Sequence, residues 1–189
     1  MKGRENGTQY QGTAYLEPEA VPRDHLIAPL RRLGIRHLAT TTPSLEDVPP
    51  SPLSLVTSLA TCPDARVRSA LIPLFLWRPD YAPAARDASG VVSGEARVYL
   101  QCSYSAALVL QHLLADTLAR ITRPEAPPLP DLFADDLGLT AYESPPLRLE
   151  EIARRHAELS GADINWRGTY EHAVAAALRF AVPEIAWSR

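Results

Sequence analysis

The sequence predicts an all-α protein, and three observations support that prediction. Apolar residues recur at helical spacing in several segments of the chain. Runs in which β-branched and polar residues alternate, as in a half-buried strand, are nearly absent. Residues 94–122 form a long segment without proline or internal glycine. We expect a compact bundle of six or seven helices around a long central helix, crossed by a Pro-rich apolar lasso.

The composition is that of a globular domain. The chain has 189 residues, 46% of them hydrophobic, and a formal net charge of −3. Residues 1–16 are polar and aperiodic, which predicts a flexible arm before a single helical domain over 17–189. The N-terminus lacks an apolar signal segment, and no stretch of 18 apolar residues occurs. We expect a cytoplasmic protein that does not span a membrane.

Four helices are expected in the first half of the chain, followed in each case by a loop or a helix-breaking residue. They cover residues 23–33, 52–60, 64–76 and 80–88. Gly34 is placed to stop the first helix, and Asp64 is placed to cap the third. Pro73 is expected to kink or shorten that third helix. Gly90 is expected to break the chain after the fourth.

The central helix is expected over residues 94–122. It is rich in alanine and leucine, and its apolar face is unusually wide. A face that broad predicts packing on two sides. Two further helices are expected near the C-terminus, over residues 147–159 and 166–181, the second with Tyr170 on its inward face.

The lasso is expected over residues 123–146, which contain six prolines and several large apolar residues. That composition is too apolar for a disordered linker. One short helical turn is expected over 131–137, with Asp131 placed like its N-cap. The apolar residues beside it, among them Leu132 and Phe133, predict docking into a groove, either the protein's own or that of a partner.

Sequence patterns for common cofactor and metal sites are absent. No glycine-rich phosphate loop and no standard zinc or calcium spacing occurs, so neither a cofactor nor a metal is expected. The acidic residues at 131, 135 and 136 are interpreted as solvated or helix-capping carboxylates. Cys62 and Cys102 are interpreted as buried small side chains. His156 is expected on a helix surface, and His112 is expected to be partly buried.

The spacing R-x4-H occurs at the start of the last predicted helix, between Arg167 and His172. Such a pair can cleave RNA without a metal, because histidine moves a proton while arginine stabilises the charge on the phosphate. The structural alternative is an ion pair between Arg167 and Glu171, with His172 on the helix surface.

The all-α pattern with R-x4-H opening the C-terminal helix resembles the HEPN class of helical domains. That family contains RNase toxins whose antitoxins are minimal nucleotidyltransferases, so the resemblance implies an RNase pair of Arg167 and His172. The stretches RVRSALIPLFLWRP (66–79) and ARRHAELSGADINWRGTYEHA (153–173) resemble uncharacterised helical proteins encoded beside nucleotidyltransferase genes. Residues 64–71 resemble the start of the second helix of a HEAT repeat, which indicates one helical hairpin.

Three functional hypotheses follow. The first is a non-catalytic interaction protein with a nucleotidyltransferase-type partner, whose control surface lies near Arg167 and His172 and includes Trp166 and Tyr170. The second is an enzyme, a metal-independent HEPN-type RNase toxin that acts on RNA as a symmetric homodimer. The third is a regulatory domain with a small-ligand pocket between the long helix and its neighbours.

Overall fold

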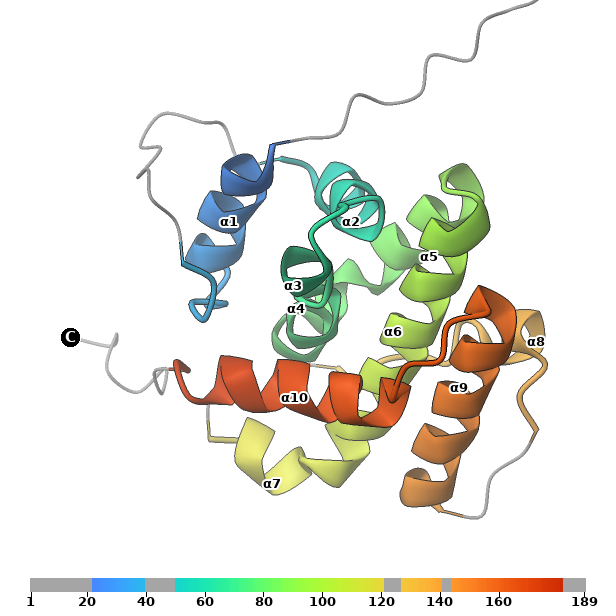
Figure 1. Cartoon of the computed structure of the whole chain (residues 1–189). Coiled ribbons are helices and arrows are strands. Elements are labelled where there is room, and N and C mark those ends of the chain that lie inside the picture. Colours follow the sequence, from blue (N-terminus) through green and yellow to red (C-terminus); the bar gives the residue numbers. More distant parts are fainter. Residues whose placement is uncertain (1–21, 40–49, 121–126, 141–143, 182–189) are drawn as a thin grey trace, which may run out of the picture.

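The computed structural model describes residues 22–39, 50–120, 127–140 and 144–181, and within these ranges the protein is helical, without a strand (Figure 1). Seven of the helices have at least seven residues, in agreement with the six or seven predicted. The helices are α1 (Arg23–Arg32), α2 (Pro52–Ala60), α3 (Ala65–Arg68), α4 (Leu71–Trp77), α5 (Ala82–Val91), α6 (Gly94–Leu113), α7 (Ala115–Leu118), α8 (Ala134–Leu137), α9 (Pro145–Ser160) and α10 (Trp166–Leu178), with a short 3-10 helix at Pro79–Tyr81.

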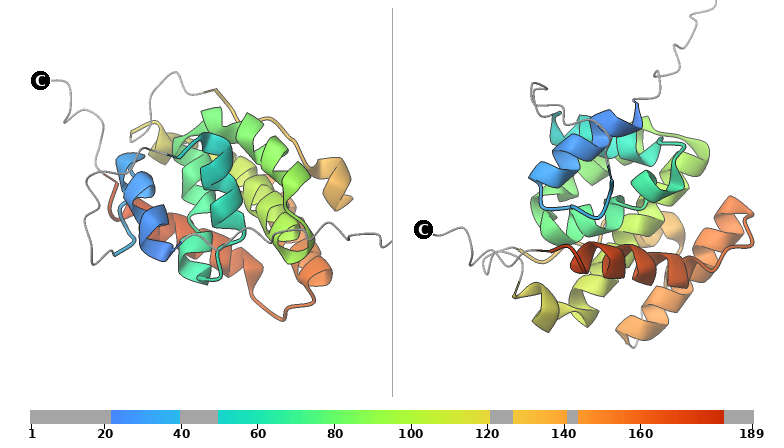
Figure 2. Two further views of the ribbon diagram at one scale, coloured as in Figure 1. Left: turned by 90° about the horizontal axis from the view of Figure 1, so that it is seen from above. Right: turned by 60° about the vertical axis from the view of Figure 1, so that its left-hand side comes forward.

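Helix α6 is the centre of the molecule. It packs against α4 and α5 on one side and against α9 on the other, so the prediction of a central helix packed on two sides is confirmed. Helix α10 contacts both α4 and α9, and the views of Figures 1 and 2 place it between them. The buried apolar residues of these helices form one contiguous core.

The central helix is shorter than predicted, because the chain leaves helical geometry at Leu114 and continues as α7. Leu113 is 41% exposed, whereas Leu118 after the break is buried. The change of direction therefore brings Leu118 into the core. No glycine or proline marks the break at Leu114 in the sequence. A prediction made from the spacing of apolar residues therefore continued the helix across it.

Pro73 divides the predicted helix over 64–76 into α3 and α4. A proline lacks an N–H group, and its ring clashes with the carbonyl four residues earlier, here that of Ser69. The break lies at that point, since α3 ends at Arg68 and α4 begins at Leu71. Asp64 caps α3 as predicted: its Oδ1 accepts hydrogen bonds from the backbone N–H groups of Arg66 and Val67, at 2.9 and 3.1 Å.

Gly90 does not break the chain as expected, because it lies inside α5. That helix begins at Ala82, after the 3-10 turn, and ends at Val91. The chain reverses over Val92 and Ser93, and Gly94 then takes a φ of +55°, in the left-handed region. Helices α5 and α6 thus form a hairpin with a very short connection.

The described part of the lasso, residues 127–140, packs into a groove of the protein itself, along α6 and α9. Leu129, Phe133 and Leu137 are buried there. From α6, the Tyr104 hydroxyl donates to the Pro130 carbonyl at 3.0 Å. The expected helical turn is present as α8, but it starts at Ala134 without a side-chain cap.

Arginine side chains from α9 hold the other edge of the lasso. Arg148, which is 4% exposed, donates to the Thr140 carbonyl at 2.6 Å and forms ion pairs with Glu151 at 3.0 Å and Asp131 at 3.6 Å. Asp131 is therefore an ion-pair partner and not the N-cap that its position suggested. Arg155 donates to the Leu137 carbonyl at the end of α8, at 2.7 Å.

The last two helices lie near their predicted positions. Helix α9 begins at Pro145 and ends before Gly161, whose φ is +66°. Helix α10 ends at Leu178, three residues earlier than predicted. None of the helices in the described ranges is long and apolar enough to cross a membrane. The expected arm over 1–16 lies outside the described residues.

Candidate functional site

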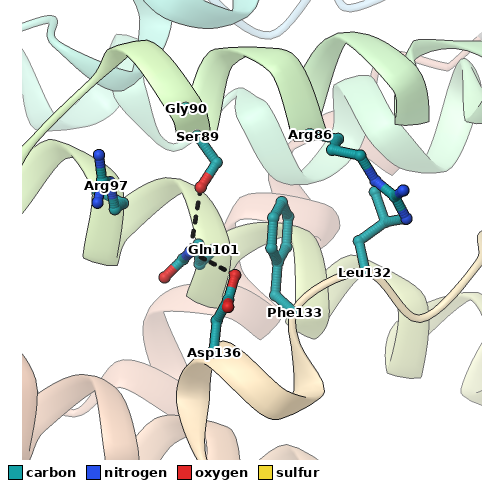
Figure 3. A pocket seen from close by; sticks show the side chains of 8 residues that line it. All are labelled: Arg86, Ser89, Gly90, Arg97, Gln101, Leu132, Phe133 and Asp136. Carbon is teal, nitrogen blue, oxygen red and sulfur yellow. Dashed lines mark hydrogen bonds between the residues drawn. The ribbon is translucent and has the colours of Figure 1, made fainter.

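A pocket of about 550 Å³ opens between the α5–α6 hairpin and the lasso (Figure 3). Small-ligand pockets typically measure about 300–1,000 Å³, so this volume is sufficient for a small ligand. Three separate segments of the chain contribute to its wall. The lining residues are Arg86, Ser89, Gly90, Arg97, Gln101, Leu132, Phe133 and Asp136.

Gln101, on α6, lies at the floor of the pocket and forms hydrogen bonds with the two other segments that line it. Its Nε2 donates to the Ser89 hydroxyl on α5 at 3.0 Å and to Oδ2 of Asp136 on α8 at 3.1 Å. Gln101 is 7% exposed, and its bond to Ser89 is buried, where polar groups must find partners. Its bond to the exposed Asp136 is partly buried. The floor is therefore a polar junction between hairpin and lasso.

Two arginines give the rim of the pocket its positive charge. Arg86 on α5 is exposed, and none of the ion pairs found among the described residues includes it. Arg97 on α6 donates from Nε to the Val92 carbonyl at 2.9 Å, which fixes the base of its guanidinium. Together with the carboxylate of Asp136, the lining carries two cationic side chains and one anionic one.

Leu132 and Phe133, two of the predicted binding residues, line this pocket. Phe133 is 2% exposed, and its ring meets the Tyr104 ring edge to face, with centroids 5.3 Å apart. Leu132 is half-buried. Burial raises the pKa of Tyr104, so its hydroxyl keeps its proton and donates to the lasso. The two apolar residues thus anchor the lasso and also present an apolar edge to the cavity.

Trp166 and Tyr170, the other predicted binding residues, lie in the core and not on a surface. They are 6% and 1% exposed. The Trp166 ring stacks on His156 at a centroid distance of 3.5 Å, and the Tyr170 hydroxyl is 2.7 Å from Nδ1 of His156. Tyr99 packs edge to face against both His156 and Trp166. Of the residues predicted for the control surface, only Arg167 and His172 therefore have exposed side chains.

His156 is buried, and the expectation of a surface position is wrong. It is 1% exposed, and burial, together with the charge of Arg68, lowers its pKa to about 3. The imidazole is therefore neutral at physiological pH. His112, expected to be partly buried, is exposed at the end of α6. Helical periodicity misplaced both histidines, because the side of a helix that faces the core depends on its neighbours.

Arg167 forms the ion pair named as the structural alternative. Its Nε is 3.1 Å from Glu171, and its Nη1 is 2.9 Å from Glu150 on α9. These carboxylates raise the pKa of Arg167, and its side chain is 43% exposed. His172 is exposed on the same helix. A guanidinium already bound by two carboxylates is less available to a phosphate, so this geometry lends the RNase hypothesis no support.

The described residues contain no group of three or more His, Cys, Asp or Glu side chains arranged to hold a metal ion. Asp131 and Asp136 are instead bonded to Arg148 and Gln101. The two cysteines are unpaired and buried as expected, and burial raises the pKa of the Cys102 thiol to about 12. A thiol with so high a pKa is a poor nucleophile at neutral pH.

Sequence reasoning missed the pocket residues on the hairpin, chiefly Arg86, Arg97 and Gln101. Each is an ordinary polar residue of a helix, and no short motif marks it. The available signal was indirect: two predicted helices joined by a short connection must lie antiparallel, which places residues on either side of the turn opposite each other. No family model, curated protein or solved structure matches the chain.

Proposed function

We propose that the protein is a regulatory domain that binds a small ligand in the pocket between the α5–α6 hairpin and the lasso. The observation that carries the proposal is the pocket itself, a cavity of about 550 Å³ whose lining combines a polar floor, an apolar edge and two arginines. Binding sites for small molecules commonly combine apolar contacts with a few polar groups that fix orientation.

The position of the pocket suggests how binding acts on the rest of the molecule. Gln101 bonds to α5 and to α8 at once, so a ligand on the floor contacts the junction of hairpin and lasso. A ligand that favours the closed junction stabilises the docked lasso, because binding shifts an equilibrium toward the state with higher affinity. The docked lasso is then the form that a downstream partner distinguishes.

A thermal-shift screen with a library of small metabolite-like compounds tests this proposal. Gly90 lines the pocket, and a Cβ added there meets no atom within 4 Å, so Gly90→Trp places a large side chain toward open space at the site. We expect ligands that raise the Tm of the wild type and of Gly90→Ala but not of Gly90→Trp. Hits that act equally on all three proteins, or no hits, would contradict the proposal.

A second candidate is the interaction protein with a nucleotidyltransferase-type partner of a toxin–antitoxin pair. Two large apolar side chains favour it, since Leu159 and Ile164 are 42% and 48% exposed on either side of the turn between α9 and α10. That turn leads directly into Arg167, part of the predicted control surface. Exposed apolar side chains beside charged ones are common at protein interfaces.

Affinity purification from the native host tests this second candidate. We expect a nucleotidyltransferase-type protein to be recovered with the tagged wild type and lost with the double variant Leu159→Gln, Ile164→Gln. Leu113→Gln is the matched control, because Leu113 is 41% exposed at the end of α6. Recovery of such a partner by the double variant, or by neither protein, would refute this surface as its binding site.

A further inference from the structure

The two arginines of the pocket lie at its opposite ends. Helices α5 and α6 run antiparallel, and the bond between Ser89 and Gln101 marks one level of the hairpin. Arg86 precedes Ser89 by three residues and Arg97 precedes Gln101 by four, so they lie on opposite sides of that level. At 1.5 Å of rise per residue, their positions along the hairpin differ by roughly 10 Å. Figure 3 shows the same arrangement, with Phe133 and Asp136 between the arginines.

Both arginines have hydrogen-bond donors to offer. The hydrogen bond of Arg97 to the Val92 carbonyl uses only Nε, and Arg86 has no hydrogen bond or ion pair among the described residues. A guanidinium binds a carboxylate or a phosphate through two parallel N–H groups, which makes such contacts strong and directional. Each end of the pocket is therefore suited to one anionic group.

The middle of the pocket disfavours an anion. The carboxylate of Asp136 lies there and receives only the bond from Gln101 among the described residues. Like charges at short distance repel, so an anionic group over Asp136 is unfavourable. The neighbouring Leu132 and Phe133 instead offer apolar contact. The middle of a ligand is thus expected to be a hydrocarbon segment, with at most a hydroxyl or amino donor facing Asp136.

We propose that the pocket binds an elongated organic dianion, with one carboxylate or phosphate at each end and a slender, largely apolar middle. This inference rests on the proposed ligand-binding function and adds the chemical class of the ligand. Arg86 and Arg97 bind the two ends, and Asp136 excludes compact anions from the centre.

Calorimetric titration of the full chain with linear dicarboxylates of four to eight carbons tests the inference. Monocarboxylates of the same length, and alkanediol bisphosphates, form the comparison arms. We expect one dicarboxylate or bisphosphate length to bind roughly tenfold or more tightly than the matched monocarboxylate, because a second charge-assisted contact is added. The tighter of the two dianion arms identifies the preferred end group.

Variants show whether both ends act. Arg86→Gln and Arg97→Gln are each expected to remove the advantage of the dianion over the monoanion. Arg154→Gln is the control, because Arg154 is an exposed arginine of α9 that does not line the pocket. Equal binding of mono- and dicarboxylates, or a dianion preference that survives both pocket variants, would overturn the inference.

The screen with Gly90→Trp separates this inference from the function on which it rests. If no dianion binds while a neutral compound stabilises the wild type and not Gly90→Trp, the ligand class is wrong and the pocket remains a binding site. If neither kind of compound binds, the proposed function is wrong as well.

Discussion

At the scale of single residues, His156 connects folding to pH. It is enclosed by Trp166, Tyr99 and Tyr170, and its Nε2 is buried without a hydrogen-bond partner among the described residues. Protonation would place a charge in this apolar environment. The folded protein therefore keeps the ring neutral, while the unfolded chain protonates it near its ordinary pKa of 6.5.

Stability is expected to fall as the pH is lowered from about 6.5 toward 3, the range between the unfolded and folded pKa values of His156. In this range the unfolded state binds more protons, so acid favours unfolding. His37, whose pKa is also lowered by burial, contributes in the same direction. Between pH 7 and 5.5 the loss from His156 is about 1 kcal/mol, measurable by urea denaturation.

His156→Gln tests the assignment, since glutamine can keep a hydrogen bond to Tyr170 but does not titrate. We expect a less stable protein at pH 7 with a weaker dependence on pH. His112→Gln, at an exposed position near the end of α6, is expected to leave the dependence unchanged. The same slope in wild type and His156→Gln would show that another group is responsible.

Two glycines of the α5–α6 hairpin are expected to respond in opposite directions to alanine. Neither Gly90 nor Gly94 has an atom within 4 Å of an added Cβ, but Gly94 has a φ of +55°. Gly90→Ala is expected to raise the unfolding free energy by roughly 0.5–1 kcal/mol, because alanine favours a helix. Gly94→Ala is expected to lower it by roughly 1 kcal/mol, because a left-handed backbone strains alanine. Chemical denaturation that changes both variants in the same direction would refute this assignment.

At the scale of elements, the lasso behaves as a structural part of the bundle. Its buried apolar side chains pack on α6. Side chains from both α6 and α9 form hydrogen bonds to its backbone. Gln111 on α6 accepts from the Leu129 N–H at 2.8 Å, and Glu151 on α9 accepts from the Thr140 N–H at 3.0 Å. Backbone groups that cannot bond within a helix are satisfied in this way by side chains.

Arg148→Met is expected to loosen the lasso, because it leaves the carboxylates of Asp131 and Glu151 without their shared cation. Removal of one partner from a buried ion pair commonly costs about 3–5 kcal/mol, and the half-exposed Asp131 places this case at or below the lower end. We expect a lower midpoint in urea and faster proteolysis within residues 127–140.

The matched control for Arg148→Met is Arg154→Met on the same helix. Arg154 is 61% exposed and pairs with Glu158 at the surface, where ion pairs contribute little. It is expected to leave both readouts nearly unchanged. Equal effects of the two substitutions would show that Arg148 does not hold the lasso.

At the scale of the whole molecule, the ion pairs that join Arg167 of α10 to Glu150 and Glu171 affect whether the protein can act as an RNase. Expression of the wild type in a bacterial host, beside Arg167→Ala and His172→Ala, is expected to give the same growth in all three cultures. The reason is that Arg167 is bound by Glu150 and Glu171 and so is poorly placed to hold a phosphate. Toxicity of the wild type that both substitutions relieve would reverse this conclusion and support the enzyme.

The sequence by itself determined the helical class and the approximate limits of the main helices, since these depend on local periodicity and on residues such as Pro73 and Asp64 that act within one turn. The apolar residues Leu132 and Phe133 also indicated that the lasso packs against another surface. Tertiary structure alone decided that Trp166 and His156 are buried beside Tyr170 and that Arg86 and Arg97 share a pocket. The physical reason is that burial and pocket formation depend on which helix faces meet, and those contacts join residues far apart in the chain.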